Sequence, residues 1–162
     1  MAAKVKAIPD GFHALTPYLT VRDAEAAMAF YRQAFGAVEV MRVPEPNGKR
    51  LMHAEVRIGD SVLMLGDTFP EFGGKNPEDL GGSAATVHLY CEDVDGVVAA
   101  ATKAGATLTM PPADMFWGDR YARLVDPFGH QWSIATHTRD LSEAEIAKGA
   151  ALAFAQNPTG SS

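Results

Sequence analysis

The sequence lacks the features of a secreted, membrane-spanning or nucleic-acid-binding protein. Its 162 residues include one cysteine, Cys91, so no disulfide can form within the chain, which fits a reducing compartment. No apolar stretch approaches the about 20 residues of a transmembrane helix, and no apolar segment follows the first lysines as in a secretory signal. Lysine and arginine form no stripe in a chain of net charge −6. We therefore expect a cytoplasmic protein with neither a membrane nor a nucleic-acid partner.

Phosphate-binding loops and an activated nucleophile are also missing. The glycine pairs at 73–74 and 81–82 do not follow a strand with phosphate-binding spacing. Cys91 is predicted to face the helices, and Ser133 has no assured base beside it. What remains is ordinary globular composition, with 47% hydrophobic and 21% charged residues, which at this length indicates one domain.

The chain repeats itself after seventy residues. Leu19-Thr-Val-Arg-Asp23 precedes an alanine-rich amphipathic segment that stops at Gly36, and Leu89-Tyr-Cys-Glu-Asp93 precedes a second one that stops at Gly105. Aspartate is a favourable helix N-cap, and glycine is favourable just after a helix ends. Each half therefore predicts a strand, a helix and three further strands, and the two halves together are expected to complete one core.

The repeat also sets the predicted domain boundaries. The segment between the halves is rich in glycine and proline and is interpreted as a linker or lid. Ser142 and Glu145 have the spacing of a capping box, which predicts a C-terminal helix followed by a frayed tail over residues 157–162. The expected boundaries are residues 12–138 for the domain, with modules at about 12–66 and 84–138 and a linker at 67–83, and residues 139–156 for the helix.

Alternation along the strands predicts two different sheet faces. One face is apolar and should pack on the two helices; Met52, Leu89 and Trp132 are assigned to it. The opposite face carries tyrosine, histidine, threonine and arginine, including His53 and Glu55. This polar face is either a ligand cleft or a surface exposed to solvent.

These motifs resemble the vicinal oxygen chelate superfamily, which includes glyoxalase I, fosfomycin and bleomycin resistance proteins and extradiol dioxygenases. The resemblance rests on the two repeated motifs together with His88-Leu-Tyr-Cys-Glu-Asp-Val-Asp95 and Asp126-Pro-Phe-Gly-His130. Met115-Phe-Trp-Gly-Asp-Arg-Tyr121, followed by Trp132-Ser-Ile-Ala-Thr-His137, looks like the PhnB-like branch. The resemblance implies an α+β fold of two tandem βαβββ modules that form curved antiparallel sheet around a cleft. It also implies a homodimer in which a partner module completes each cleft.

Catalytic members of the superfamily hold a divalent metal with one His or Glu from each of four strands. Carried over by motif, these positions are occupied here by Thr16, Leu63 (or Met64, if the register slips by one), Thr86 and Ser133. None of these side chains is a strong ligand for a divalent metal. We therefore predict that the family metal site is lost, and we expect no cofactor.

The remaining chemistry predicts a small-molecule binding protein. Aromatic rings beside charged groups can stack on a flat ligand, and Arg123 could pair with a carboxylate, a phosphonate or Glu55. Phe116 and Trp117 could equally close the end of the barrel or fill a dimer interface. The predicted ligand-binding residues are Tyr18, His53, Glu55, His88, Tyr90, Phe116, Trp117, Tyr121 and Arg123.

An enzyme is the alternative hypothesis, namely a lyase or isomerase of the glyoxalase type. In that case His53, Glu55 or His88 would act as a general base, or the three would be ligands of a displaced metal. Stoichiometric binding without turnover would indicate the binding protein. Metal- or pH-dependent consumption of a substrate would indicate the enzyme.

Overall fold

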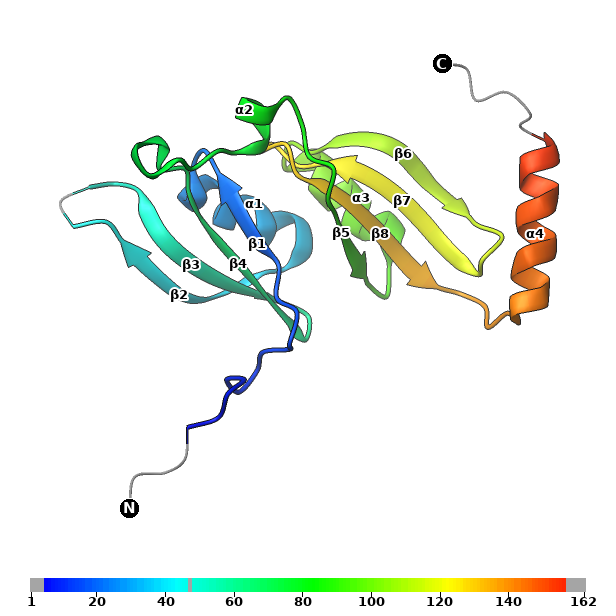
Figure 1. The fold of residues 1–162 in the computed structure, drawn as a ribbon. Helices are drawn as coiled ribbons and strands as arrows, with labels where there is room; N and C mark the ends of the chain where they lie inside the picture. Colours follow the sequence, from blue (N-terminus) through cyan, green and yellow to red (C-terminus); the bar gives the residue numbers. More distant parts are fainter. Residues whose placement is uncertain (1–4, 47, 157–162) are drawn as a thin grey trace.

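Two four-stranded sheets lie next to each other in the computed structural model, each with helices on one of its faces (Figure 1). The structure describes residues 5–46 and 48–156. The first module consists of β1 (Tyr18–Val21), α1 (Ala24–Phe35), β2 (Val38–Pro44), β3 (Leu51–Ile58) and β4 (Ser61–Asp67). The second consists of β5 (Thr86–Tyr90), α3 (Val94–Lys103), β6 (Thr107–Asp114), β7 (Asp119–Val125) and β8 (Gln131–His137). The 3-10 helix η1 (Pro70–Phe72) and α2 (Pro77–Leu80) lie between the modules, and α4 (Glu143–Gln156) follows them.

The helices α1 and α3 begin where the repeat predicts. The Asp23 carboxylate accepts a hydrogen bond from the backbone N–H of Ala26, and α1 ends at Gly36 in the left-handed conformation with φ 66°. The Asp93 carboxylate likewise accepts from the N–H of Gly96 at the start of α3. These two caps confirm the predicted helix starts. None of the helices in the described ranges has the length and apolarity of a membrane span.

Both sheets are mixed, which refines the antiparallel sheet that the resemblance implied. The strand orders are β1-β4-β3-β2 and β5-β8-β7-β6, and the pairs β1–β4 and β5–β8 are parallel. The reason is that each helix carries the chain to the far edge of its sheet. Two hairpins then return it beside the first strand in the same direction. The α+β fold of two βαβββ modules is confirmed.

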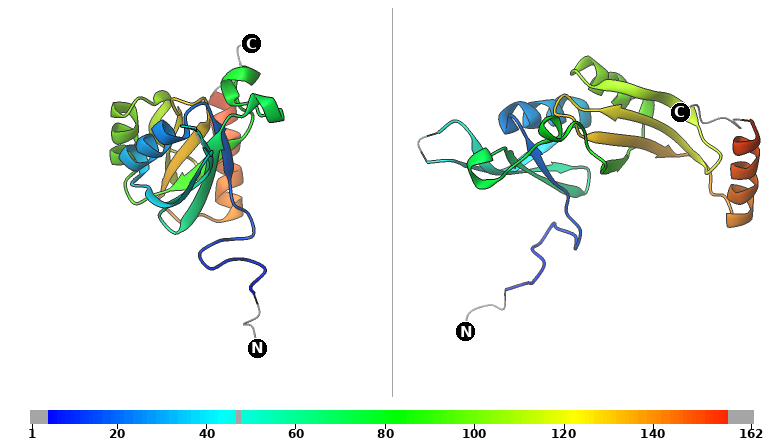
Figure 2. Two further views of the ribbon diagram at one scale, coloured as in Figure 1. Left: turned by 90° about the vertical axis from the view of Figure 1, so that its left-hand side faces the viewer. Right: turned by 45° about the horizontal axis from the view of Figure 1, so that its top comes forward.

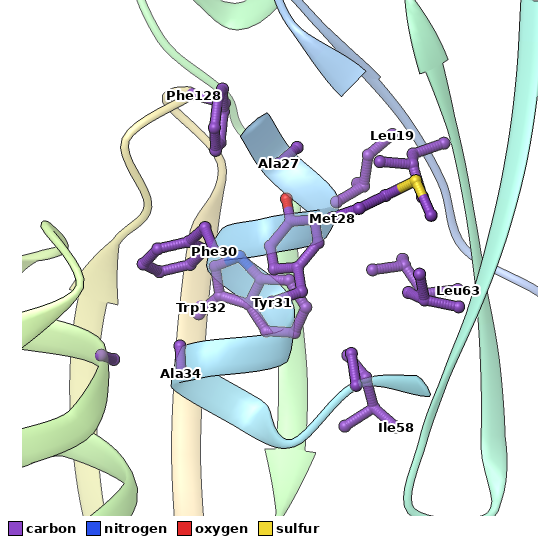
Figure 3. Close-up of a cluster of buried hydrophobic side chains, with 14 of the residues drawn as sticks. Leu19, Ala27, Met28, Phe30, Tyr31, Ala34, Ile58, Leu63, Phe128 and Trp132 are labelled. Atoms are coloured by element: carbon purple, nitrogen blue, oxygen red, sulfur yellow. The ribbon is translucent and has the colours of Figure 1, made fainter. Parts of the chain in front are cut away.

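The two modules share one core, because α1 packs on strands of both sheets (Figure 3). The ring of Phe35 lies 4.6 Å from that of Trp132 on β8, and the ring of Tyr31 lies 5.5 Å from it, measured between centroids. Trp132 is only 1% exposed, and Cys91 is partly buried against the same core, so both predicted face assignments are confirmed. Figure 2 shows α1 and α3 side by side on one side of the sheets.

The turn of residues 126–130, between β7 and β8, also joins the modules. The imidazole Nε2 of His130 lies 3.0 Å from the carbonyl oxygen of Thr20 on β1. Arg22 donates a hydrogen bond of 2.6 Å to the carbonyl oxygen of Pro127, and its guanidinium lies over the ring of Phe128. A turn of the second module is therefore docked on the first.

The assignment of Met52 to the apolar face is wrong. Met52 is 52% exposed, whereas Leu51 is 3% exposed and belongs to the core. Val43 pairs with His53 and the next residue, Pro44, pairs with Leu51, so Met52 is an extra residue without a partner on β2. Such a bulge interrupts the alternation of side chains between the two faces of a sheet.

The seventy-residue repeat holds for the first strands but shifts by one at the last. Tyr18 on β1 pairs with Met64, whereas His88, seventy residues later, pairs with Ser133. Met64 is therefore the structural counterpart of Ser133, and Leu63 is 4% exposed within the core. The corresponding residues of β4 and β8 are therefore 69 residues apart, one fewer than the repeat.

The helix α4 lies beyond the end of the β6–β7 hairpin and has no buried residue (Figure 1). Gly149 faces Phe116, and a Cβ atom added at Gly149 would lie 2.8 Å from the Cβ of Phe116. Leu152 and Phe154 are 56% and 79% exposed. The tail of residues 157–162, predicted to be frayed, lies outside the described residues.

Candidate functional site

Each sheet has a second face without a helix on it, which we call its open face. On the open face of the first sheet, His53 lies between two polar neighbours. Its Nε2 is 3.1 Å from Oε1 of Glu55, and its Nδ1 is 3.4 Å from the hydroxyl of Tyr18. Glu55 is only 8% exposed, and it lines a hollow with Met64 and the N-terminal residue Phe12. This open face thus brings together three of the predicted residues.

Two aromatic residues of the linker extend this open face, and the sequence analysis missed them. Phe69 and Phe72 line a hollow of about 290 Å³ together with Tyr18 and Met52. The guanidinium of Arg50 lies 4.0 Å above the centroid of the Phe69 ring, which holds the ring in place. The sequence feature that could have indicated them is a pair of phenylalanines in a segment otherwise rich in glycine and proline.

The open face of the second sheet carries a continuous row of rings. The centroid of His88 lies 4.6 Å from that of Tyr90 and 6.2 Å from that of Tyr121, on which it stacks. The ring of Trp117 meets that of Tyr121 edge-on at 5.4 Å. We call these four residues, His88, Tyr90, Trp117 and Tyr121, the aromatic row. Four of the predicted residues from β5, β7 and the loop before β7 are thus adjacent.

A buried carboxylate joins the two terminal residues of the aromatic row, Tyr90 and Trp117. Asp119 is 4% exposed and accepts hydrogen bonds from Nε1 of Trp117 at 3.1 Å and from the hydroxyl of Tyr90 at 3.3 Å. Its other oxygen lies 2.7 Å from Nδ1 of His137. Burial, and then the charge and hydrogen bond of Asp119, raise the pKa of Tyr90. The sequence analysis did not identify Asp119 and His137 as part of the site, although Asp119 lies in the aromatic loop.

Arg123 and Phe116 flank the aromatic row and also contact residues outside it. Arg123 donates a hydrogen bond of 3.0 Å to the side-chain oxygen of Gln131, and Glu55, its suggested partner, lies on the other sheet. Phe116 meets Trp117 edge-on at 5.0 Å but turns its Cβ toward Gly149 of α4. It therefore supports the loop from the side of the helix.

The four family metal positions hold two threonines, a serine and a leucine. The Thr16 hydroxyl donates to the carbonyl oxygen of His13, the Ser133 hydroxyl lies 2.6 Å from Nδ1 of His88, Leu63 is in the core, and Thr86 is exposed. Hydroxyl and aliphatic groups do not fit a divalent metal.

The structure does not bring His53, Glu55 and His88 together as a displaced metal site. His53 and Glu55 adjoin each other on the first sheet, whereas His88 is on the second. Within residues 5–46 and 48–156, no group of three or more His, Cys, Asp or Glu side chains is placed to hold a metal ion.

Comparison with known proteins establishes the family. A family model described as the Glyoxalase/Bleomycin resistance protein/Dioxygenase superfamily matches residues 11–134. The chain belongs to this superfamily. It is 47% identical over 136 residues to an uncharacterized protein of Mycobacterium bovis, covering 82% of this chain and 89% of that protein. An uncharacterized protein of Arabidopsis thaliana is 30% identical over 118 residues, covering 67% of this chain and 69% of that protein.

Solved structures that resemble this chain in sequence have the same fold. TioX from Micromonospora sp. ML1 is 25% identical and superimposes with a TM-score of 0.60, covering 77% of this chain and 98% of that one. A gene product of Arabidopsis thaliana is 27% identical with a TM-score of 0.62, covering 76% and 98%. Superfamily membership fixes the fold but not the activity, because this fold supports several unrelated chemistries.

Proposed function

We propose that the chain is a cytoplasmic small-molecule binding protein of the glyoxalase/bleomycin-resistance type, which holds a flat, amphiphilic ligand on its open sheet faces. The observation that carries this proposal is the aromatic row, which Asp119 fixes through Trp117 and Tyr90. Rings that are already held in place lose little entropy when a flat ligand stacks on them. Arg123 lies close to the row on β7, and its guanidinium favours a ligand that carries an anionic group.

Binding without a metal is part of this proposal. The support is chemical, because the family positions offer two threonines, a serine and either Leu63 or Met64. The Ser133 hydroxyl is moreover engaged by His88. We expect ligand affinity to depend on rings and hydrogen bonds rather than on coordination.

A homodimer is also part of the proposal. Tyr90 and Tyr18 on the two open faces are 60% and 50% exposed, and Phe72 of the linker is 85% exposed. Apolar surface of this kind on a small protein favours association, and a second copy is the simplest partner. The PhnB-like branch, suggested by the aromatic loop of residues 115–121, remains our assignment within the superfamily.

The proposal is tested with an anionic probe, 2-naphthoate, that quenches tryptophan emission. Trp117 and Trp132 are the only tryptophans of the chain, and Trp132 is buried on the opposite face. We expect saturable quenching in the unmodified protein and its loss in the Trp117→Phe variant. The same quenching in Trp117→Phe would contradict binding on the aromatic row. Consumption of the probe, followed by chromatography, would contradict a purely binding role.

A specific observation also favours the enzyme hypothesis, a lyase or isomerase with a general base on the first sheet. Nε2 of His53 lies 3.1 Å from Oε1 of Glu55, and this contact with a carboxylate that is 8% exposed orients the imidazole. Such a pair can accept and return a proton at a substrate carbon, which contributes about 10²–10⁴-fold in rate. This second function would be established if a bound candidate ligand is turned over by the unmodified protein and not by the His53→Gln or Glu55→Gln variant. Unchanged turnover in His53→Gln would exclude it.

A further inference from the structure

A cavity of about 410 Å³ lies at the junction of the two modules, and its edge is shared with His88 and Tyr90 of the aromatic row. We call it the junction cavity. Its walls come from the segment that leads into β1, from the β3–β4 turn and from β5. Its floor includes Ile58 and Leu63 from the first sheet and Trp132 from the second, which are 8%, 4% and 1% exposed. Figure 3 shows these three side chains with α1 between the two sheets.

The repeat shows that this space is a local loss of packing. Leu19 on β1 is 7% exposed, but its counterpart Leu89 on β5 is only half-buried. Val87, which pairs with Trp132 across the β5–β8 ladder, is half-buried as well. Both Leu89 and Val87 line the junction cavity. The apolar side of β5 therefore lacks the cover that β1 has, and an apolar molecule in the cavity would supply it.

The rim of the junction cavity indicates the polarity of its occupant. Asp60 and Ser61 lie at the rim and bond to each other, with the Ser61 hydroxyl donating to the carboxylate at 2.8 Å. The residues that line the cavity include no lysine or arginine, so nothing there offsets the charge of an anion beside Asp60. His88 also reaches the rim, with Nδ1 held by Ser133. Its ring stacks on Tyr121 on the open face, so Asp60 and Ser61 are the groups at the rim that can bond to a polar end.

We propose that the junction cavity binds a small neutral molecule with an apolar body of one to three rings and a single hydrogen-bonding end. The volume falls in the range of about 300–1,000 Å³ that is typical of small-molecule sites. The ring body lies against Trp132, Leu63 and Leu89, and the polar end lies at the rim beside Asp60 and Ser61. This site goes beyond the proposed function, since its floor consists of the core residues Ile58, Leu63 and Trp132, whereas Trp117, Tyr121 and Arg123 of the open face do not line it.

The test uses N-phenyl-1-naphthylamine, a neutral fluorescent amine that accepts excitation energy from tryptophan. In the full-length Trp117→Phe variant, Trp132 is the single donor. We expect saturable energy transfer with about one probe bound per chain. Transfer that does not saturate, or that occurs only when Trp117 is present, would overturn the proposal.

A matched pair of variants locates the probe. Val87→Phe places a ring in the junction cavity and should weaken probe binding at least about tenfold. Val43→Phe makes the same change on the exposed edge strand β2, outside the cavity, and should leave binding unchanged. Equal affinity in the two variants would overturn the proposal.

A replacement variant and a competition experiment complete the test of the junction cavity. Ser61→Leu narrows the mouth of the cavity at an exposed position, so it replaces Val87→Phe if that variant does not fold; unchanged probe affinity in Ser61→Leu would then overturn the proposal. An excess of 2-naphthoate should not displace the neutral probe. Displacement would place the probe on the aromatic row and overturn the junction site, whereas failure of 2-naphthoate to bind affects only the proposed function.

Discussion

At the scale of single residues, Asp126 is the most heavily bonded side chain of the module junction. Its Oδ2 accepts from the hydroxyl of Tyr31 at 2.8 Å and from Nε1 of Trp132 at 3.0 Å. Its Oδ1 accepts from the backbone N–H groups of Phe128 and His130. A carboxylate that is 4% exposed needs such partners, because burial without them would be costly. Burial and the neighbouring Asp126 raise the pKa of Tyr31 well above its ordinary value.

Removing this carboxylate should lower the free energy of unfolding. Asp126→Ala leaves four buried donors without an acceptor, and we expect a loss of about 2–4 kcal/mol in urea denaturation. Tyr31→Phe removes one donor only and should cost about 1 kcal/mol. The control is Asp114→Ala, which affects an exposed ion pair with Arg120 and should cost well under 1 kcal/mol. Equal effects of Asp126→Ala and Asp114→Ala would contradict this role of Asp126.

Arg123 should affect ligand binding rather than folding. Its side chain is exposed on the open face, where it bonds to Gln131. Arg123→Ala should weaken the binding of 2-naphthoate by about 1.5–3 kcal/mol, because a charge-assisted hydrogen bond is lost. Isothermal titration measures the affinity, and thermal unfolding provides the control for folding. An Arg123→Ala variant that does not fold would show that this polar side chain is structural.

At the scale of elements, the sequence was informative wherever local chemistry decides the structure. Capping aspartates and terminal glycines identified both helices, and alternation placed Trp132 on the buried face. Alternation failed at Met52, since a bulge depends on the neighbouring strand. The choice between Leu63 and Met64, which the sequence left open, depends in the same way on the pairing of β4 with β1. The rings of the linker, such as Phe72, were missed because only the folded chain brings them beside β1 and β3.

The link between β8 and α4 should depend on pH. His137 lies between Asp119 and Asp140, and its hydrogen bonds to Asp119 and then to Asp140 raise its pKa above the ordinary value. A raised pKa in the folded state means that the stabilisation is complete at low pH and is lost as the pH rises through that pKa. An NMR titration should show this elevation in the unmodified protein and a smaller one in Asp119→Asn. The same His137 pKa in both would contradict the contact.

At the scale of the whole molecule, the open faces and α4 leave apolar groups exposed, and we predict a homodimer. Light scattering at micromolar concentration should give twice the chain mass of 17.3 kDa. Deleting residues 143–156 tests whether α4 contributes to the dimer interface. Phe154 on α4 is 79% exposed in the single chain and is therefore free to contact a second copy. A monomer at that concentration would refute the dimer.

The same whole-molecule view predicts metal independence. Elemental analysis of purified protein should find much less than one metal ion per chain, and EDTA should leave the melting temperature unchanged. The basis is the donor set at the four family positions, where Thr16 lies two residues before β1 and Thr86 begins β5. One tightly held transition metal per chain would contradict this and would favour a site that includes His53 and Glu55.

Because of the docked turn of residues 126–130, we predict that the two modules stay associated when the covalent link between them is cut. Asp126 and His130 contact α1 and β1 directly, and Phe35 and Trp132 share the same core. The linker runs over the outside, with Phe72 exposed beside Gly73. A protease cut after Phe72 should therefore leave two fragments that co-purify. Two half-length genes, divided at this point, should likewise yield polypeptides that reassemble into one domain.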